Sequence, residues 1–230
     1  MDTIPGTLWL LHVAAMLVLT TVRCDEEDEP RKGSDICGGP RHVCTTLMKY
    51  PDGYVANEGP YCTCSDGNCG SAWSDNDDRA LTWQHYERGH WRVQYRFCQS
   101  VMAEDKVREC GSGELSTVVK TEVTTWKPYM DTMRCRCRHD LYHMIGWTRD
   151  GNVWKYSYKC EKNGCKENDG VCATIFMDLS KKTDIVKEVK FKCACPRGYL
   201  CPAKIRDESK ETEAQKEVKC QPIKQSHNKI

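Results

Sequence analysis

A Cys-x-Cys pair that occurs three times constrains this chain more than any other feature. The pairs are Cys62-Thr63-Cys64, Cys135-Arg136-Cys137 and Cys193-Ala194-Cys195. Each pair lies inside a longer frame of cysteines with similar spacing, and self-similarity along a chain is the signature of a repeat architecture. The sequence therefore predicts three tandem copies of one cysteine module.

The cysteine frames set the expected domain boundaries. Module one covers residues 37–98, module two residues 110–160 and module three residues 165–220. Modules one and three hold six cysteines each, whereas module two holds four. Residues 221–230 form a polar tail, for which we expect a frayed end.

The N-terminus predicts export. An apolar run from Leu8 to Leu19 suits a secretory signal peptide and is too short to span a bilayer. We expect residues 1–24 to be removed as the signal peptide, and residues 25–36 to be an acidic tail or a propeptide. The mature protein is then expected to be secreted, extracellular and monomeric, with no transmembrane segment.

The cysteine count agrees with that cleavage. Seventeen cysteines are an odd number, but loss of Cys24 leaves sixteen, which is enough for eight disulfides. Such a density belongs to an oxidising compartment. Three Phe and a mean hydropathy of −0.68 leave little ordinary core. Disulfides, each contributing about 2–4 kcal/mol, are expected to supply the missing stability.

The fold class that follows is small, disulfide-rich and mainly β, with three tandem cysteine modules built on short β-hairpins and eight disulfides. Residues 91–97 alternate apolar with polar side chains, as a strand does. The turn at residues 149–152 leads into a second alternating run, residues 154–160, which predicts a hairpin. Residues 62–64 are expected to form a short strand. The charged segment 207–219 is expected to be a helix or a mobile loop.

The cysteines that module two lacks predict two disulfides. Cys37 and Cys62 are 25 positions apart, as are Cys110 and Cys135, so module two lacks the second and fifth cysteines of the frame. Two cysteines missing together are expected to be bonded to each other in the other modules. The predicted bonds are therefore Cys44–Cys69 and Cys172–Cys201. A bond within a Cys-x-Cys pair is strained. The remaining cysteines pair either first with third and fourth with sixth, or first with fourth and third with sixth.

Module three resembles a known family. The run Cys193-Ala194-Cys195-Pro196 through Leu200-Cys201, ending at Cys220, is similar to the C-terminal part of the prokineticin and colipase-like fold. That resemblance implies the pairs Cys165–Cys193, Cys172–Cys201 and Cys195–Cys220. The candidate disulfide residues are Cys37, Cys62, Cys44, Cys69, Cys64, Cys98, Cys110, Cys135, Cys137, Cys160, Cys165, Cys193, Cys172, Cys201, Cys195 and Cys220.

The layout of the whole chain gives a second resemblance. A signal peptide followed by sixteen cysteines looks like the large cysteine-rich proteins of centipede venom, scoloptoxin family eleven. Both resemblances imply a secreted ligand and not an enzyme. We therefore expect a venom toxin that modulates an ion channel through a basic and aromatic surface. The alternatives are an endogenous prokineticin-like ligand or haemolymph factor and, more remotely, a calcium-dependent phospholipase.

Basic side chains supply the candidate binding surface. With Met133, Cys135 and Cys137 facing inward, a strand through this region turns Arg134, Arg136 and Arg138 outward. Guanidinium groups in such a row can bind acidic groups of a channel or receptor. The candidate binding residues are Arg134, Arg136, Arg138, Lys190 and Lys192. Arg92 and Arg96 are expected to repeat the pattern in module one. The alternative interpretation is the solvated face of a half-buried strand.

Two groups of residues resemble a catalytic or a metal-binding motif. His139-Asp140 resembles the dyad of secreted phospholipases A2, but Cys110-Gly111-Ser112-Gly113 lies too far away to be the calcium loop. His139 and His143 stand four residues apart beside Cys135 and Cys137, a spacing that can bind zinc where the cysteines are free thiols. In an oxidising compartment these cysteines are expected in disulfides. No catalytic residue, metal or cofactor is therefore expected, and an exported protein of this charge is not expected to bind nucleic acid.

Overall fold

The computed structural model describes residues 35–84, 91–101, 107–139, 141–161, 163–166, 170–183, 185–204 and 212–223. The regular elements in these ranges are strands, which bears out the disulfide-rich, mainly β fold class. In chain order they are β1 (Val43–Lys49), β2 (Val55–Asn57), β3 (Ala80–Gln84), β4 (Arg92–Phe97), β5 (Leu115–Glu122), β6 (Pro128–Met133), β7 (Leu141–Asp150), β8 (Val153–Lys159), β9 (Val171–Met177), β10 (Val186–Phe191), β11 (Tyr199–Leu200), β12 (Gln215–Lys219) and β13 (Gln221–Pro222).

Some expectations fall on other parts of the chain. The signal peptide, residues 25–34 of the acidic tail and residues 224–230 of the polar tail lie outside the described residues. Among the residues that the structure does describe, no helix is both long enough and apolar enough to cross a bilayer.

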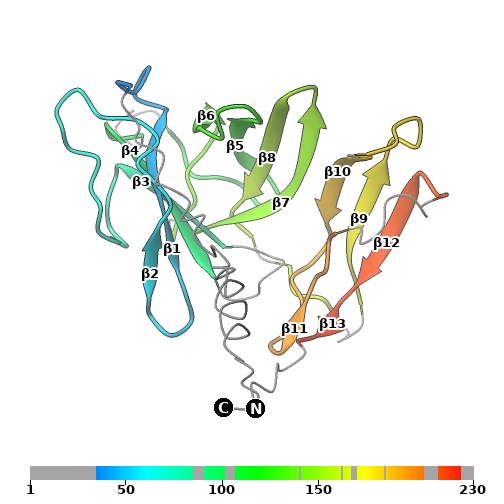
Figure 1. The fold of residues 1–230 in the computed structure, drawn as a ribbon. Helices are drawn as coiled ribbons and strands as arrows, with labels where there is room; N and C mark the ends of the chain where they lie inside the picture. The colour runs from blue at the N-terminus through cyan, green and yellow to red at the C-terminus, as the bar shows by residue number, and fades with distance from the viewer. Residues whose placement is uncertain are drawn as a thin grey trace, which may run out of the picture.

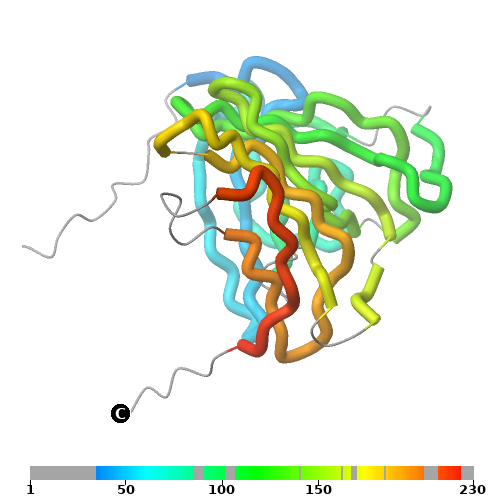
Figure 2. The backbone as a smooth tube through the Cα atoms, turned by 90° about the vertical axis from the view of Figure 1, so that its right-hand side faces the viewer, coloured from blue at the N-terminus to red at the C-terminus, as the bar shows by residue number. Residues whose placement is uncertain are grey.

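The three modules repeat one strand arrangement. In each, the first strand lies between the second and the fourth: β1 between β2 and β4, β5 between β6 and β8, and β9 between β10 and β12. All of these pairings are antiparallel. Figure 1 shows the three groups next to one another, and Figure 2 shows β12 beside β9 in the third group. The same pairing order therefore recurs in each of the three cysteine frames.

Strand β7 joins the modules into one sheet. It pairs with β8 of its own module and also with strands of the two neighbours. Its beginning runs parallel to β3 of module one, where Tyr142 lies opposite Trp83. Further along it runs antiparallel to β10 of module three, where Trp147 lies opposite Val189. The sheet of eleven strands is therefore continuous through all three modules.

The Cys-x-Cys segments form single β-bridges, so the short strand expected at residues 62–64 is wrong. Ile36 bridges Thr63, Glu109 bridges Arg136 and Gly164 bridges Ala194, each in parallel orientation. In every module the first cysteine donates its backbone N–H to the carbonyl of the residue between the paired cysteines, at 2.9–3.0 Å. The repeat is therefore visible in single hydrogen bonds as well as in strand order.

Other local expectations have mixed outcomes. The hairpin of residues 149–160 is confirmed, because β7 and β8 are joined at Gly151 and Asn152. The strand expected at residues 91–97 is confirmed as β4. The helix or loop expected at residues 207–219 is wrong for residues 215–219, which form β12 on the edge of β9. Backbone pairing to β9 thus decides the conformation of a segment whose charged composition suggested otherwise.

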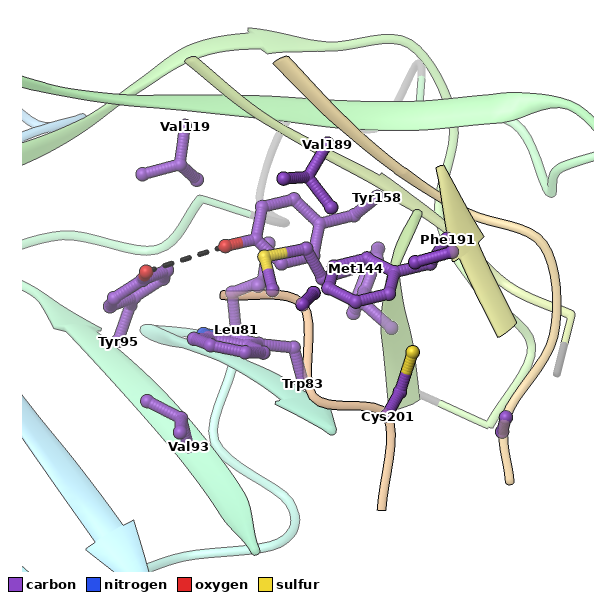
Figure 3. Packing of buried hydrophobic residues seen from close by; sticks show 14 of the residues in the cluster. Leu81, Trp83, Val93, Tyr95, Val119, Met144, Tyr158, Val189, Phe191 and Cys201 are labelled. Carbon is purple, nitrogen blue, oxygen red and sulfur yellow. Dashed lines mark hydrogen bonds between the residues drawn. The ribbon is translucent and has the colours of Figure 1, made fainter. Parts of the chain in front are cut away.

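Side chains from all three modules share one hydrophobic core (Figure 3). Trp83 packs with its ring 5.8 Å from that of Tyr95 and 5.4 Å from that of Tyr158. The hydroxyls of Tyr95 and Tyr158 lie 3.3 Å apart, which links β4 of module one to β8 of module two. Val189 of module three is fully buried in the same cluster. The largest core is therefore common to all three modules.

Two hydrogen bonds occupy the place of the disulfide that module two lacks. Ser116 is the second residue of β5, as Cys44 is of β1, and its hydroxyl donates to the carbonyl of Cys135 at 2.7 Å. Tyr142 follows Cys137 by five positions, as Cys69 follows Cys64. Its hydroxyl accepts the backbone N–H of Cys137 at 3.4 Å. Both side chains are fully buried. The segment after Cys137 is thus held by packing, and it continues directly into β7.

A substitution at Gly146 tests whether stability depends on the close approach of the β7 backbone to the β10 backbone. A Cβ atom at residue 146 would lie 2.3 Å from the carbonyl oxygen of Val189. We expect Gly146→Ala to lower the free energy of unfolding by about 1–3 kcal/mol, because the two backbones must separate. Thermal unfolding of the oxidised protein measures the change. Gly39→Ala is the control, since a Cβ there meets nothing within 4 Å. Equal melting temperatures for both variants would contradict this packing.

Candidate functional site

All sixteen cysteines of the three frames are in disulfides. The bonds are Cys37–Cys62, Cys44–Cys69, Cys64–Cys98, Cys110–Cys135, Cys137–Cys160, Cys165–Cys193, Cys172–Cys201 and Cys195–Cys220. Cys44–Cys69 and Cys172–Cys201 are the two pairs that the gap in module two predicts. For the others, the structure has first with third and fourth with sixth, and in module three these are the pairs that the resemblance implies.

The disulfides of a module lie against one another. The Sγ atoms of Cys165 and Cys220, which belong to different disulfides, are 3.6 Å apart. In module one, Cys44, Cys62, Cys64 and Cys98 form a buried cluster of their own. In each module, sulfur atoms of different disulfides thus lie close together. We call this group of disulfides the disulfide knot of the module. Loops and surfaces next to the knot are held rigidly.

The arginines of module two lie on the outside of such a knot. Cys135 and Cys137 are buried, whereas Arg134, Arg136 and Arg138 are exposed, so the predicted alternation is present. The backbone of Arg136 is fixed by the bridge to Glu109, with hydrogen bonds in both directions to residues 108 and 110. A rigid backbone thus presents three guanidinium groups to solvent. We call Arg134, Arg136 and Arg138 the arginine surface.

Acidic side chains partly offset this surface. Arg138 lies 3.7 Å from the carboxylate of Glu109, with both side chains largely exposed. Glu114 forms a two-point ion pair with Arg108. The hydrogen bonds from Arg108 and the Gly111 backbone, with a smaller effect of the nearby Arg134 charge, lower the pKa of Glu114 to about 2. These two glutamates thus offset two of the four arginines Arg108, Arg134, Arg136 and Arg138.

Arg136 also reaches a feature of module one. It lines a cavity of about 210 Å³ together with the acidic loop, here meaning residues 74–78. Asp75 and Asp78 of that loop are exposed, and Asp77 is half-buried. The arginine surface is thus flanked by carboxylates of two modules. A partner has to compete with them, and sequence reasoning missed them because they are distant along the chain.

The lysines of module three are a separate group. Lys190 and Lys192 are exposed, as predicted, but each is paired with a glutamate. Lys190 lies 3.4 Å from Glu188 and above the ring of Phe176, and Lys192 lies 2.6 Å from Glu217. All of these partners belong to module three. The two lysines add less free positive charge than the sequence suggested.

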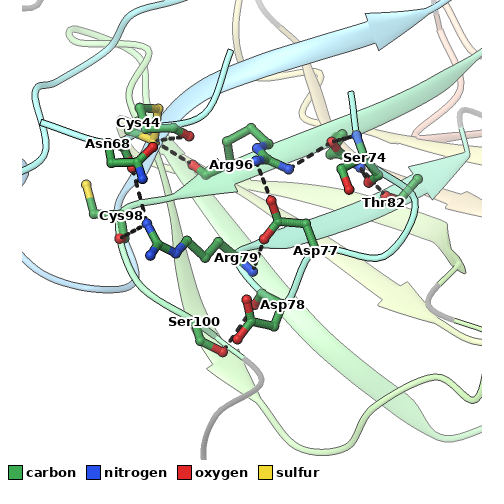
Figure 4. Close-up of polar contacts among 12 residues, drawn as sticks. Cys44, Asn68, Ser74, Asp77, Asp78, Arg79, Thr82, Arg96, Cys98 and Ser100 are labelled. Carbon is green, nitrogen blue, oxygen red and sulfur yellow. Dashed lines mark hydrogen bonds and ion pairs between the residues drawn. A yellow bond between two sulfur atoms is a disulfide. The ribbon is translucent and has the colours of Figure 1, made fainter. Parts of the chain in front are cut away.

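Arg96 is not a surface residue, so its place in the module-one pattern is a correction. Only Arg92 of that pair is exposed, because the acidic loop packs over the polar side of β4 and buries Gln94 and Arg96. Arg96 forms an ion pair with Asp77 (Figure 4). Gln94 donates to the carbonyl of Ser74 at 2.7 Å. A strand with two buried faces can still alternate in sequence when a polar loop covers its second face.

The structure places His139 and His143, but only one residue of the His139-Asp140 dyad is described. His139 is exposed, His143 is buried in β7, and Asp140 lies outside the described residues. Cys135 and Cys137 are in disulfides, so their sulfurs are not the thiolates that a zinc site with His139 and His143 requires. The same holds for the close groups of sulfur atoms in each module, which consist of bonded cysteines.

Comparisons with known proteins do not assign this chain to a family. No protein-family model matches the chain, and no curated protein sequence matches it. The crystal structure of unliganded Argos matches with a TM-score of 0.37 and 18% sequence identity, over 82% of this chain and 92% of that chain. A likeness at this level carries no argument about the present protein.

The Arg96–Asp77 pair gives a prediction about acid stability. Burial by itself would raise the pKa of Asp77, but the Arg79 backbone N–H and the Arg96 guanidinium outweigh burial and lower it. A lowered folded-state pKa stabilises the protein above the unfolded value, near pH 4, and that contribution is lost as the pH falls through the folded value. Asp77→Asn is expected to cost about 1–3 kcal/mol at pH 7, because Arg96 loses its counter-charge.

Melting temperatures measured from pH 7 to pH 2 check this. The difference between Asp77→Asn and the parent protein should shrink as the pH falls below 4. Asp78→Asn is the control, because its carboxylate is exposed one position further along the same loop. A constant difference at every pH would contradict the ion pair as the source of the stability.

Proposed function

We propose that this is a secreted protein that acts by binding an extracellular protein partner. The observation that carries the proposal is the arginine surface on a disulfide knot, because a rigid backbone presents its charged groups with little ordering cost on binding. Eight disulfides also persist only in an oxidising environment, which fits a protein that works outside the cell.

The specific role that we propose is that of a venom toxin that modulates an ion channel. Its support is the layout, an expected signal peptide followed by sixteen cysteines, and the exposed guanidinium groups of the arginine surface, which suit the acidic groups at a channel entrance. In this proposal Arg134, Arg136 and Arg138 bind those acidic groups, and charge attraction speeds the encounter. The protein binds as a monomer and needs no cofactor.

One observation favours a second candidate, an endogenous prokineticin-like ligand or haemolymph factor. The three disulfides of module three have the pairing that the prokineticin and colipase-like resemblance implies. The two candidates differ in where the protein is found. Mass spectrometry of venom and haemolymph from the source animal distinguishes them, since a toxin should be abundant in venom and scarce in haemolymph.

Charge reversal tests the arginine surface. We expect Arg134→Glu, Arg136→Glu and Arg138→Glu, made together, to weaken the block of a sensitive channel at least ten-fold. The reason is that three attractive contacts become repulsive. Electrical recordings over a panel of voltage-gated channels give the readout, and higher salt should weaken the parent protein but not the variant.

The control for that experiment is Lys181→Glu with Lys182→Glu, which changes exposed charges in the connection between β9 and β10. Non-reducing peptide mapping first establishes that both variants have the parent disulfides. Unchanged potency of the triple variant on every sensitive channel would contradict a role for the arginine surface. Absence of any channel effect, with receptor responses present instead, would favour the endogenous ligand.

A further inference from the structure

A cleft lies where module one meets module two, and none of the three residues of the arginine surface lines it. Its volume is about 410 Å³, and its walls are the start of module one, residues 35–43, and the end of the β5–β6 hairpin, residues 122–129. The two walls are bonded to each other, because His42 bridges Tyr129 and the N–H of Met130 donates to the carbonyl of Arg41 at 2.8 Å. The rings of His42 and Tyr129 meet edge to face, 5.9 Å apart. The cleft is thus a fixed feature of the fold.

Two exposed large apolar residues belong to the segments that form this cleft. Ile36, which lines it, is 70% exposed. Trp126 is 46% exposed and lies between Thr125 and Lys127, which both line the cleft. The other tryptophans in the described ranges are buried or half-buried. Exposed large apolar side chains on the segments of one cleft are typical of a site where another molecule binds.

The backbone conformation of Trp126 also indicates a binding role for this turn. Its φ angle is +54°, and it is the only non-glycine residue in the described ranges with a positive φ. Bulky side chains avoid this left-handed region, whereas Asn and Gly accept it. Its N–H is held by the carbonyl of Glu122 at 2.8 Å, so the turn fixes the conformation. A disfavoured conformation that displays an indole to solvent is the kind of strain that functional sites retain.

The charges of the cleft select the partner. Asp35 lies 3.2 Å from Lys127, and these two charges offset each other. Glu122 is exposed, lines the cleft, and has no ionic partner in the part of the chain that the structure describes. The uncompensated charge is therefore negative, and it complements a basic group.

We propose that this cleft is a docking site for an extracellular protein segment that presents an apolar side chain next to an arginine or lysine. The apolar side chain packs against Ile36 and Trp126, and the basic group pairs with Glu122. The inference rests on the proposed binding role but does not depend on the arginine surface. It gives the protein two binding surfaces of opposite charge.

Selection from a phage-displayed library of random peptides on the full oxidised protein tests the proposal. We expect the selected peptides to contain arginine or lysine beside an aliphatic or aromatic residue. Synthetic copies of these peptides should bind at least ten-fold more weakly to Trp126→Asn and to Ile36→Ser, and more weakly to Glu122→Gln. Asn accepts the positive φ, so the melting temperature of Trp126→Asn should equal or exceed that of the parent.

Two controls make the result specific. Leu179→Ser removes an exposed apolar side chain of similar exposure, 41%, that does not line the cleft, and it should bind the peptides normally. The triple arginine variant should also bind them normally, even where it loses channel activity, so failure of one surface is distinguishable from failure of the other. Three results would overturn the proposal: no peptide is enriched, the selected peptides lack a basic residue, or their affinity is unchanged by Trp126→Asn and Ile36→Ser.

Discussion

The backbone pairing of β7 is the interaction on which the rest of this structure depends. His143 pairs with both β8 and β3, and Thr148 with both β8 and β10, so β8 takes one edge of β7 and the neighbouring modules take the other. Without these pairings, no strand pairing of β7 would join module two to its two neighbours. With them, a chain poor in phenylalanine builds one shared core around Trp83 and Tyr158. The arginine surface and the cleft between modules both have fixed positions because the modules do.

Module two, which supplies this strand, has one disulfide fewer than its neighbours. In modules one and three a disulfide, Cys44–Cys69 or Cys172–Cys201, ties the segment after the Cys-x-Cys pair to the first strand. In module two that segment enters the sheet within a few residues, and Ser116 and Tyr142 replace the covalent link with hydrogen bonds. The module whose missing cysteines predicted the disulfide pairing is thus also the module that connects the other two.

Much of the module could be predicted from sequence because cysteine spacing and alternation are local signals. The repeat, the β-hairpins, the pairs Cys44–Cys69 and Cys172–Cys201, and the outward direction of Arg134 and Arg136 all follow from residues near one another. What could not be predicted depends on distant contacts. Arg96 is buried because a loop some twenty residues earlier covers it, and β12 is a strand because β9 offers it an edge. The cleft beside Trp126 exists only because two modules meet, and nothing in either segment alone indicates that meeting.

Differential scanning calorimetry of the intact oxidised protein tests the central claim, that one sheet and one core unite the three modules. The account predicts a single unfolding transition whose calorimetric enthalpy equals the van't Hoff enthalpy, because no module keeps a core when β7 is released. Two or three separate transitions, or a calorimetric enthalpy several times the van't Hoff value, would contradict it and would show modules that fold independently.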